Sequence, residues 1–126
     1  MRRTNKIVMK TRYESFEIEL NDSDTANAIF LALPLTREVS TWGGEIYFEV
    51  PVEHPLENGK KVLEVGEVAF WPEGNAFCIF FGRTPFSKGR QPEAYGPVTP
   101  IGRVVSNIER LEGMAERTEI VLEHSF

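Results

Sequence analysis

The stretch that decides the fold is Gly66-Glu67-Val68-Ala69-Phe70-Trp71-Pro72-Glu73-Gly74-Asn75-Ala76-Phe77-Cys78-Ile79-Phe80-Phe81-Gly82-Arg83-Thr84-Pro85. It holds two apolar runs of strand length, Val68–Trp71 and Phe77–Phe81, separated by the turn-forming residues Pro72–Asn75. Apolar residues occupy successive rather than alternate positions in both runs. This pattern predicts strands that are buried on both faces or bent into the wall of a barrel.

Shorter strands and one clear helix flank this central pair. Residues 5–12 and 15–20 predict a hairpin, and Asn21–Asp24 supply capping side chains for a helix near 24–33, which Pro34 ends. Further strands are predicted at 45–50, 62–65, 101–105 and 118–123, and a short helix capped by Ser106 and Gly113 carries Ile108 and Leu111. Residues 82–100 are predicted to be irregular. The pattern predicts one domain over residues 1–126, a closed antiparallel β-barrel of about eight strands with two helices.

Composition excludes several classes of protein. The chain has 126 residues and a net charge of −5, which argues against nucleic-acid binding. No apolar run is long enough for a membrane span, and the apolar segment after the basic residues 2–6 is too short for a signal peptide, so we expect a cytoplasmic protein. His54 and His124 are far apart without other ligands at metal spacing, so no metal and no cofactor are expected.

Single residues of chemical interest have plain structural interpretations. Cys78 lies within an apolar run and is interpreted as a small core residue rather than a nucleophile. Glu45 and Glu49 share one face of a predicted strand and are interpreted as solvated carboxylates, with an acid–base pair as the alternative.

The order of elements resembles that of cyclophilins. The hairpin followed by a helix at 25–30, the strand Ile46–Val50 ending at Pro51, and Gly102–Ile108 each resemble a cyclophilin segment. The chain is also similar to an uncharacterised family of small prokaryotic cyclophilin-like proteins in three sequence motifs, Thr41-Trp42-Gly43, Glu45–Phe48 and Phe80–Pro85. The resemblance covers nearly the whole chain and implies the cyclophilin fold.

The chain departs from cyclophilins where they catalyse prolyl isomerisation. Phe48 occupies the position that matches the family's substrate-contacting arginine. The position that matches a glutamine of the cyclophilins falls at about Ala76. Phenylalanine cannot donate a hydrogen bond to the prolyl nitrogen. The positions of the groove phenylalanine and tryptophan hold Cys78 and Phe86. The resemblance therefore implies the fold with little or no isomerase activity.

Three functions remain open from the sequence. The first is a module that binds a small molecule or short peptide in an aromatic groove, with the basic loop residues Arg83, Lys88 and Arg90 attracting an acidic or carbonyl end of the ligand. The second is a weak peptidyl-prolyl isomerase using Arg83 as donor, and the third, by fold analogy alone, is an enzyme acting on small amides. The oligomeric state is left open. The candidate groove residues are Trp42, Tyr47, Phe48, Trp71, Cys78, Arg83 and Phe86.

Overall fold

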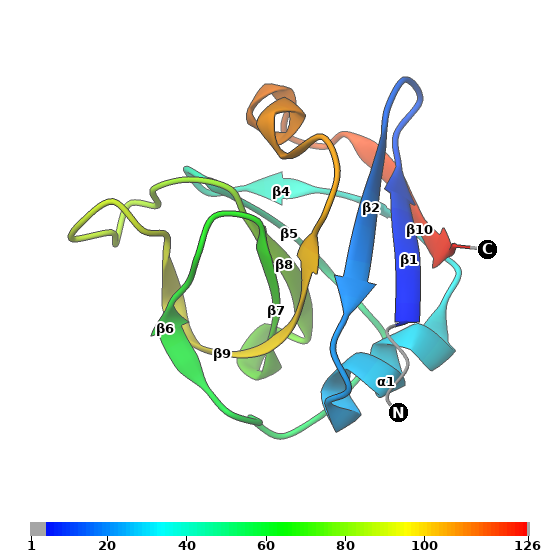
Figure 1. Ribbon diagram of the computed structural model, residues 1–126, viewed down its shortest axis with the longest axis horizontal. Coiled ribbons are helices and arrows are strands. Elements are labelled where there is room, and N and C mark those ends of the chain that lie inside the picture. The colour runs from blue at the N-terminus through cyan, green and yellow to red at the C-terminus, as the bar shows by residue number, and fades with distance from the viewer. Residues whose placement is uncertain (1–4, 126) are drawn as a thin grey trace.

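The computed structural model describes residues 5–125, which form one large antiparallel sheet with short helices (Figure 1). The strands are β1 Asn5–Lys10, β2 Ser15–Leu20, β3 Leu35–Glu38, β4 Ser40–Thr41, β5 Glu45–Glu49, β6 Lys60–Val62, β7 Glu67–Trp71, β8 Ala76–Phe80, β9 Glu93–Val104 and β10 Glu119–His124. The α-helix α1 spans Asp24–Ala32, and the 3₁₀ helices η1 and η2 span Pro72–Gly74 and Ile108–Gly113. No helix within residues 5–125 is long and apolar enough to cross a membrane.

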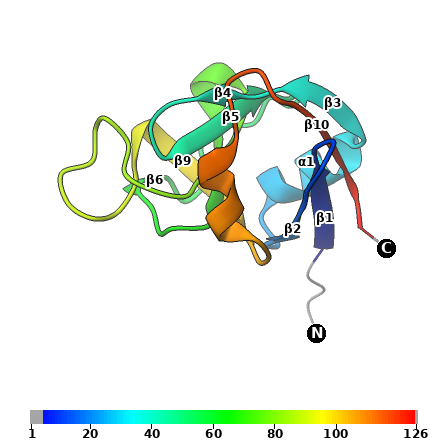
Figure 2. The same ribbon diagram turned by 90° about the horizontal axis from the view of Figure 1, so that it is seen from above.

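The ten described strands pair in the order β3-β10-β1-β2-β9-β7-β8-β5-β4, and β6 pairs with β9. This confirms a mainly β, antiparallel architecture. The expected closed barrel is not found, because hydrogen bonding leaves β3 and β4 as two ends of the sheet within residues 5–125. Only Val39 separates β3 from β4, so the chain itself holds the two ends near one another, as the curved outline in Figures 1 and 2 shows.

The central strand pair is as the apolar runs predict. β7 and β8 pair in antiparallel register, and Asn75 takes the left-handed conformation (φ 49°) that closes the turn between them. Every residue of β8 is buried. Phe77 and Ile79 point into the main core, whereas Ala76, Cys78 and Phe80 belong to a second, smaller cluster on the opposite face. β8 is therefore a wall between two apolar compartments.

Helix α1 forms where the capping residues predict it. The Ser23 hydroxyl accepts the N–H of Ala26 at 3.1 Å, and the buried side chains of Ala26 and Ile29 join the main core. A second cap comes from a distant loop, because the Glu57 carboxylate accepts the N–H of Thr25 at 3.0 Å and its hydroxyl at 2.8 Å. The helix ends at Ala32, ahead of Pro34.

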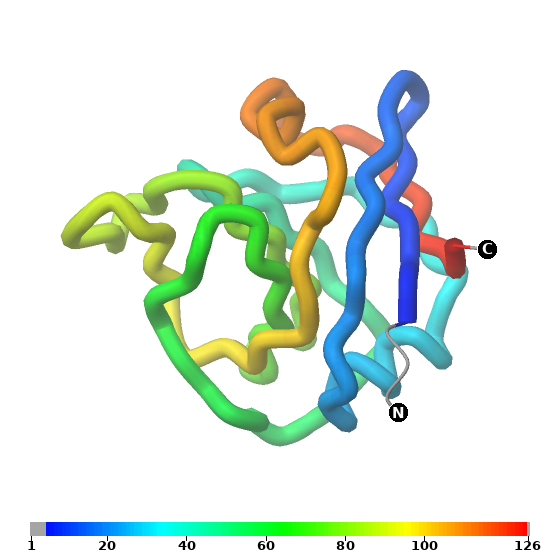
Figure 3. The backbone as a smooth tube through the Cα atoms, viewed as in Figure 1, coloured from blue at the N-terminus to red at the C-terminus, as the bar shows by residue number. Residues whose placement is uncertain are grey.

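Residues 93–100 are strand, and their prediction as irregular backbone is wrong. β9 runs from Glu93 to Val104 and bends from β6 across β7 to β2 (Figure 3). Its prolines are tolerated because the pairing is interrupted near them: the register with β7 shifts between Val68 and Ala69, where Pro100 lies opposite Ala69. The sequence also gave no signal for the short strands β3 and β4.

The second predicted helix exists as the 3₁₀ helix η2, but its caps differ. The Ser106 hydroxyl accepts the N–H of Glu17 instead of capping the helix, and Asn107 occupies the cap position with φ 56°. Gly113 lies inside η2 rather than after it. Leu111 is buried in the main core as its spacing predicts.

Candidate functional site

A hollow open to solvent lies on the second face of the central strands, where several of the side chains are small. Ala69, Ala76 and Cys78 occupy this face, whereas the other face carries Phe70 and Phe77. The hollow is a cavity of about 340 Å³, near the lower end of the range for small-molecule sites, and Cys78 and Ala94 are its small lining residues. We call it the aromatic pocket; it is lined by Trp42, Glu45, Tyr47, Trp71, Cys78, Ala94, Tyr95 and Val98.

Aromatic rings from separate strands form the walls of the aromatic pocket. The ring of Tyr95 lies at a steep angle to both indoles, with its centroid 6.1 Å from that of Trp42 and 5.7 Å from that of Trp71. The two tryptophans therefore flank one cavity with Tyr95 between them. Both are partly exposed, so their rings reach the mouth of the pocket as well as its interior.

Trp71 is held in place by packing. It is the last residue of β7, and η1 turns the chain directly after it. A Cβ atom at Gly74 would lie 2.6 Å from the Trp71 ring, so only glycine lets the indole lie flat against this turn. The side chain is fixed before any ligand arrives, which lowers the entropic cost of binding.

Trp42 and Glu45 are positioned by a tight turn between β4 and β5. The N–H of Trp42 donates to the carbonyl of Glu45 at 2.9 Å, and Gly43 between them has a φ of 59°. The next residue, Gly44, lies directly against Gly82: a Cβ there would be 2.2 Å from the Gly82 carbonyl carbon. The Gly43-Gly44 pair therefore fixes the aromatic ring and the carboxyl of this turn relative to the end of β8.

Glu45 is buried, so its interpretation as a solvated carboxylate is wrong; Glu49, on the same strand face, is exposed as expected. Glu45 begins β5, is only 6% exposed and lines the aromatic pocket. Burial raises the pKa of the Glu45 carboxyl to about 7, and a hydrogen bond with the Cys78 side chain opposes that rise. The pocket thus contains an acid that changes charge near neutral pH.

Cys78 is 2% exposed, which agrees with its interpretation as a small buried residue. Burial and the neighbouring Glu45 raise the pKa of the Cys78 thiol well above its usual range. A thiol of this kind stays protonated at neutral pH, so it contributes shape and a weak hydrogen bond to the pocket rather than a nucleophile.

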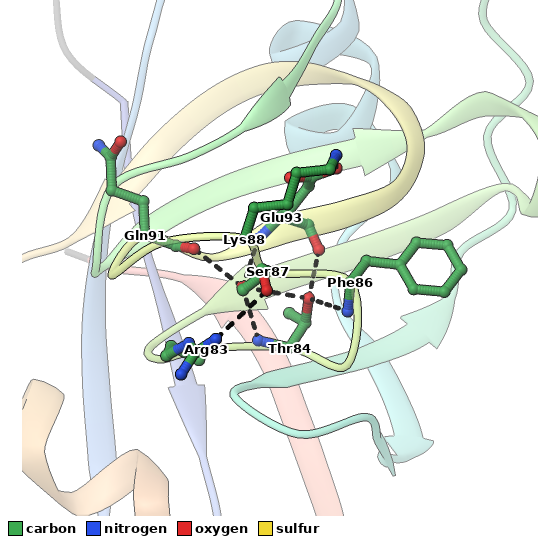
Figure 4. Close-up of polar contacts among 7 residues, drawn as sticks. All are labelled: Arg83, Thr84, Phe86, Ser87, Lys88, Gln91 and Glu93. Carbon is green, nitrogen blue, oxygen red and sulfur yellow. Dashed lines mark hydrogen bonds and ion pairs between the residues drawn. The ribbon is translucent and has the colours of Figure 1, made fainter.

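The basic loop lies outside the pocket lining. Figure 4 shows that Thr84 and Ser87 hold the loop together: the Thr84 hydroxyl donates to the carbonyl of Glu93, and the Ser87 hydroxyl donates to the carbonyl of Gln91 at 2.8 Å. Arg83 donates to the carbonyl of Ser87 at 3.3 Å, and Lys88 pairs with Glu93 at 3.0 Å. These cations are engaged within the loop.

The loop nevertheless brings Phe86 to the mouth of the pocket. Its ring stacks on Tyr95 at a centroid distance of 5.4 Å and meets Trp42 edge to face at 5.0 Å. Phe86 is 44% exposed and does not line the cavity itself. It extends the aromatic surface outward from Trp42 and Tyr95.

The structure brings together four of the seven residues named from the sequence, namely Trp42, Tyr47, Trp71 and Cys78, and places Phe86 beside them. Phe48 points to the opposite face, where it is buried in the main core and stacks on Phe77 at 5.1 Å. Arg83 is exposed in the loop. Sequence reasoning missed Glu45, Ala94, Tyr95 and Val98, the last three because their segment reads as proline-rich loop.

The two histidines are structural. His54 Nδ1 lies 2.9 Å from the Thr25 hydroxyl near the start of α1, and His124 Nε2 lies 2.7 Å from the carbonyl of Phe30. Among the residues that the structure describes, no cluster of three or more histidine, cysteine or acidic side chains is arranged to hold a metal ion.

Comparisons with known proteins identify a family and a similar solved structure. The family model described as "Cyclophilin-like" matches residues 5–123. Among solved structures, the solution structure of the hypothetical protein AF2241 from Archaeoglobus fulgidus is similar, with 36% sequence identity and a TM-score of 0.83. That match covers 97% of this chain and 95% of the archaeal one. No curated protein matches the chain.

Proposed function

The chain belongs to the cyclophilin-like family, and we propose that it is a binding domain that holds a small molecule in the aromatic pocket. One observation carries the proposal: four aromatic side chains surround a single buried carboxyl in a preformed cavity of about 340 Å³. Apolar walls around a few fixed polar groups are the usual composition of small-molecule sites.

The packing around the pocket supports this proposal. The small side chain of Cys78 on β8 leaves room for the cavity, and Gly44 and Gly74 allow the close contacts that hold Trp42 and Trp71. An acidic side chain is also costly to bury without a charged partner. The burial of Glu45, which is only 6% exposed, is accounted for if a ligand contacts its carboxyl group.

Prolyl isomerase activity is less well supported. Phe48 is 3% exposed in the main core, on the face away from the aromatic pocket, and carries no donor. Arg83, the alternative donor, is bonded to the carbonyl of Ser87 and does not line the pocket. Neither side chain is positioned to donate to a prolyl nitrogen bound there.

A fragment screen by protein-observed NMR tests the proposal. The probes are neutral, cationic and anionic fragments, and those that bind are expected to shift the resonances of Trp42, Trp71 and Tyr95. Tyr95→Ala should weaken the tightest fragment by about 1–3 kcal/mol, because Tyr95 forms a wall of the pocket.

Tyr13→Ala is the matched control, since Tyr13 is 84% exposed and lies in the β1–β2 hairpin rather than the pocket. Equal weakening by both substitutions, or shifts that never include pocket residues, would contradict the proposed function.

A further inference from the structure

The charge of the pocket lining indicates the kind of ligand, provided that the aromatic pocket is a binding site as proposed. Of the eight lining residues, Glu45 is the only carboxylic acid, and none is a lysine, arginine or histidine. The remaining titratable side chains are Cys78 on β8, Tyr47 on β5 and Tyr95 on β9. Glu45 is therefore the one carboxylate that the lining itself supplies.

The aromatic walls of the pocket, like its carboxyl group, favour a cation over an anion. The faces of tryptophan and tyrosine rings carry partial negative charge and attract cations within about 6 Å of the ring centre. Tyr95 stands at 71° to Trp42 and at 74° to Trp71, so the three rings line the cavity at steep angles instead of stacking into one surface. A group bound in the cavity can therefore contact more than one ring.

The basic loop does not reverse this preference. Lys88 pairs with Glu93, Arg83 donates to Ser87, and Arg90 lines a separate surface hollow with Lys61. The acidic or carbonyl ligand expected from the three cations in sequence is therefore not favoured by their positions. The chain as a whole is acidic, at −5, which favours the approach of cations.

We propose that the ligand of the aromatic pocket is a small organic cation, an amine or quaternary ammonium compound, whose charged group lies among Trp42, Trp71 and Tyr95 with Glu45 as its counter-ion. Glu45 supplies the full negative charge and the rings supply a surface that a substituted ammonium group can contact without losing strong hydrogen bonds. A neutral ligand would gain the apolar contacts alone.

Binding is then coupled to ionisation of Glu45. With a pKa of about 7 in the empty pocket, the carboxyl is largely protonated in mildly acidic solution and ionised in mildly alkaline solution. A cation binds the ionised form, so its affinity should rise as the pH passes through 7 and level off above it. A ligand held only by apolar contact would show no such rise.

Choline and 3,3-dimethylbutan-1-ol are the probes, because they share a shape and differ in the charge of one group. Titration calorimetry should show choline binding at least ~10-fold more tightly than the alcohol at about pH 8, with this advantage lost at about pH 5.5. Glu45→Gln should weaken choline at least ~10-fold and leave the alcohol unchanged. The pH arm uses the wild-type chain, so the test stands even if the variant folds poorly.

Equal or tighter binding of the alcohol would overturn the cation assignment while leaving the pocket as a small-molecule site. Failure of both probes would overturn it as well, and the fragment screen decides separately whether the pocket binds anything. A short peptide containing trimethyl-lysine, titrated in parallel, distinguishes the source of the cation. Tighter binding of that peptide than of choline would overturn the assignment to a free small molecule.

Discussion

Glu45 and Cys78 lie on the neighbouring strands β5 and β8 and line the same cavity, where each perturbs the pKa of the other. Burial has the larger effect and raises the pKa of Glu45 to about 7, while the neighbouring Cys78 thiol lowers it. The two residues therefore set the charge of the pocket jointly, and each can be changed separately.

Cys78→Ala should raise the pKa of Glu45 above about 7, because the substitution removes the hydrogen bond that favours the ionised carboxyl. The carbon-13 resonance of the Glu45 carboxyl, followed through a pH titration, gives this value directly. Cys78→Ser is the matched control, since serine keeps a donor at the same position. A midpoint that falls in Cys78→Ala would show that the hydrogen bond is absent.

Glu45 should make the folded chain less stable as the pH rises. Its pKa is about 7 when folded against 4.5 for the unperturbed side chain. Between these values the unfolded chain binds fewer protons than the folded chain, so the free energy of unfolding falls with increasing pH. Relative to Glu45→Gln, the wild-type protein should lose up to about 3 kcal/mol between about pH 4 and about pH 8.

Urea denaturation of both proteins across this range measures the difference, and other titrating groups cancel in the comparison. Parallel stability curves for the two proteins would contradict the buried, protonated Glu45 described here.

Glu57→Gln should destabilise the fold by about 1 kcal/mol, because Glu57 caps α1 from a distant loop. These hydrogen bonds lower the pKa of Glu57, the Thr25 hydroxyl contributing most. The stabilisation is therefore present above the unfolded pKa and lost as the pH falls through the lower, folded value. Thermal unfolding near neutral pH measures the loss. Glu53→Gln, an exposed change on the same connection, should leave the midpoint where it was.

Gly44→Ala should be severely destabilising, by about 2 kcal/mol or more, because the added Cβ would lie 2.2 Å from the Gly82 backbone. The matched control is Gly89→Ala, where an added Cβ meets no atom within 4 Å. Denaturation midpoints of the two variants should differ clearly. Similar midpoints would mean that the turn at Gly43-Gly44 can relax away from β8.

Prolyl isomerase activity should be absent or at least ~100-fold below that of a true cyclophilin, since the position of the catalytic arginine holds the buried Phe48. A protease-coupled isomerisation assay measures the rate. A rate typical of cyclophilins would refute this expectation, and Arg83→Ala would then show whether the loop arginine supplies the donor.

The sequence predicts the central part of this fold well because its signals there are local. Turn chemistry at Pro72–Asn75 and the unbroken apolar runs on either side determine β7 and β8, and the helical period of Ala26 and Ile29 determines most of α1. β9 could not be predicted, since Pro100 lies at a register shift with β7 and Pro97 lies in the irregular part of the pairing with β6, neither of which a local pattern encodes.

The candidate site was predictable only in part for the same reason. Trp42 and Trp71 stand beside turns that are visible in the sequence, so they could be singled out. Tyr95 belongs to the strand that was missed. Glu45 alternates with apolar residues as a surface carboxylate does, but it is buried in a pocket that residues of the distant strand β9 also line. Burial by a distant segment leaves no mark on local periodicity.

A ligand of this protein is expected to bind in the aromatic pocket. Intermolecular nuclear Overhauser effects between the tightest fragment of the screen and the wild-type protein test this most directly. The account predicts contacts from the fragment to the ring protons of Trp42, Trp71 and Tyr95. Contacts confined to another surface hollow, such as the one lined by Pro51 and Val52, would contradict it.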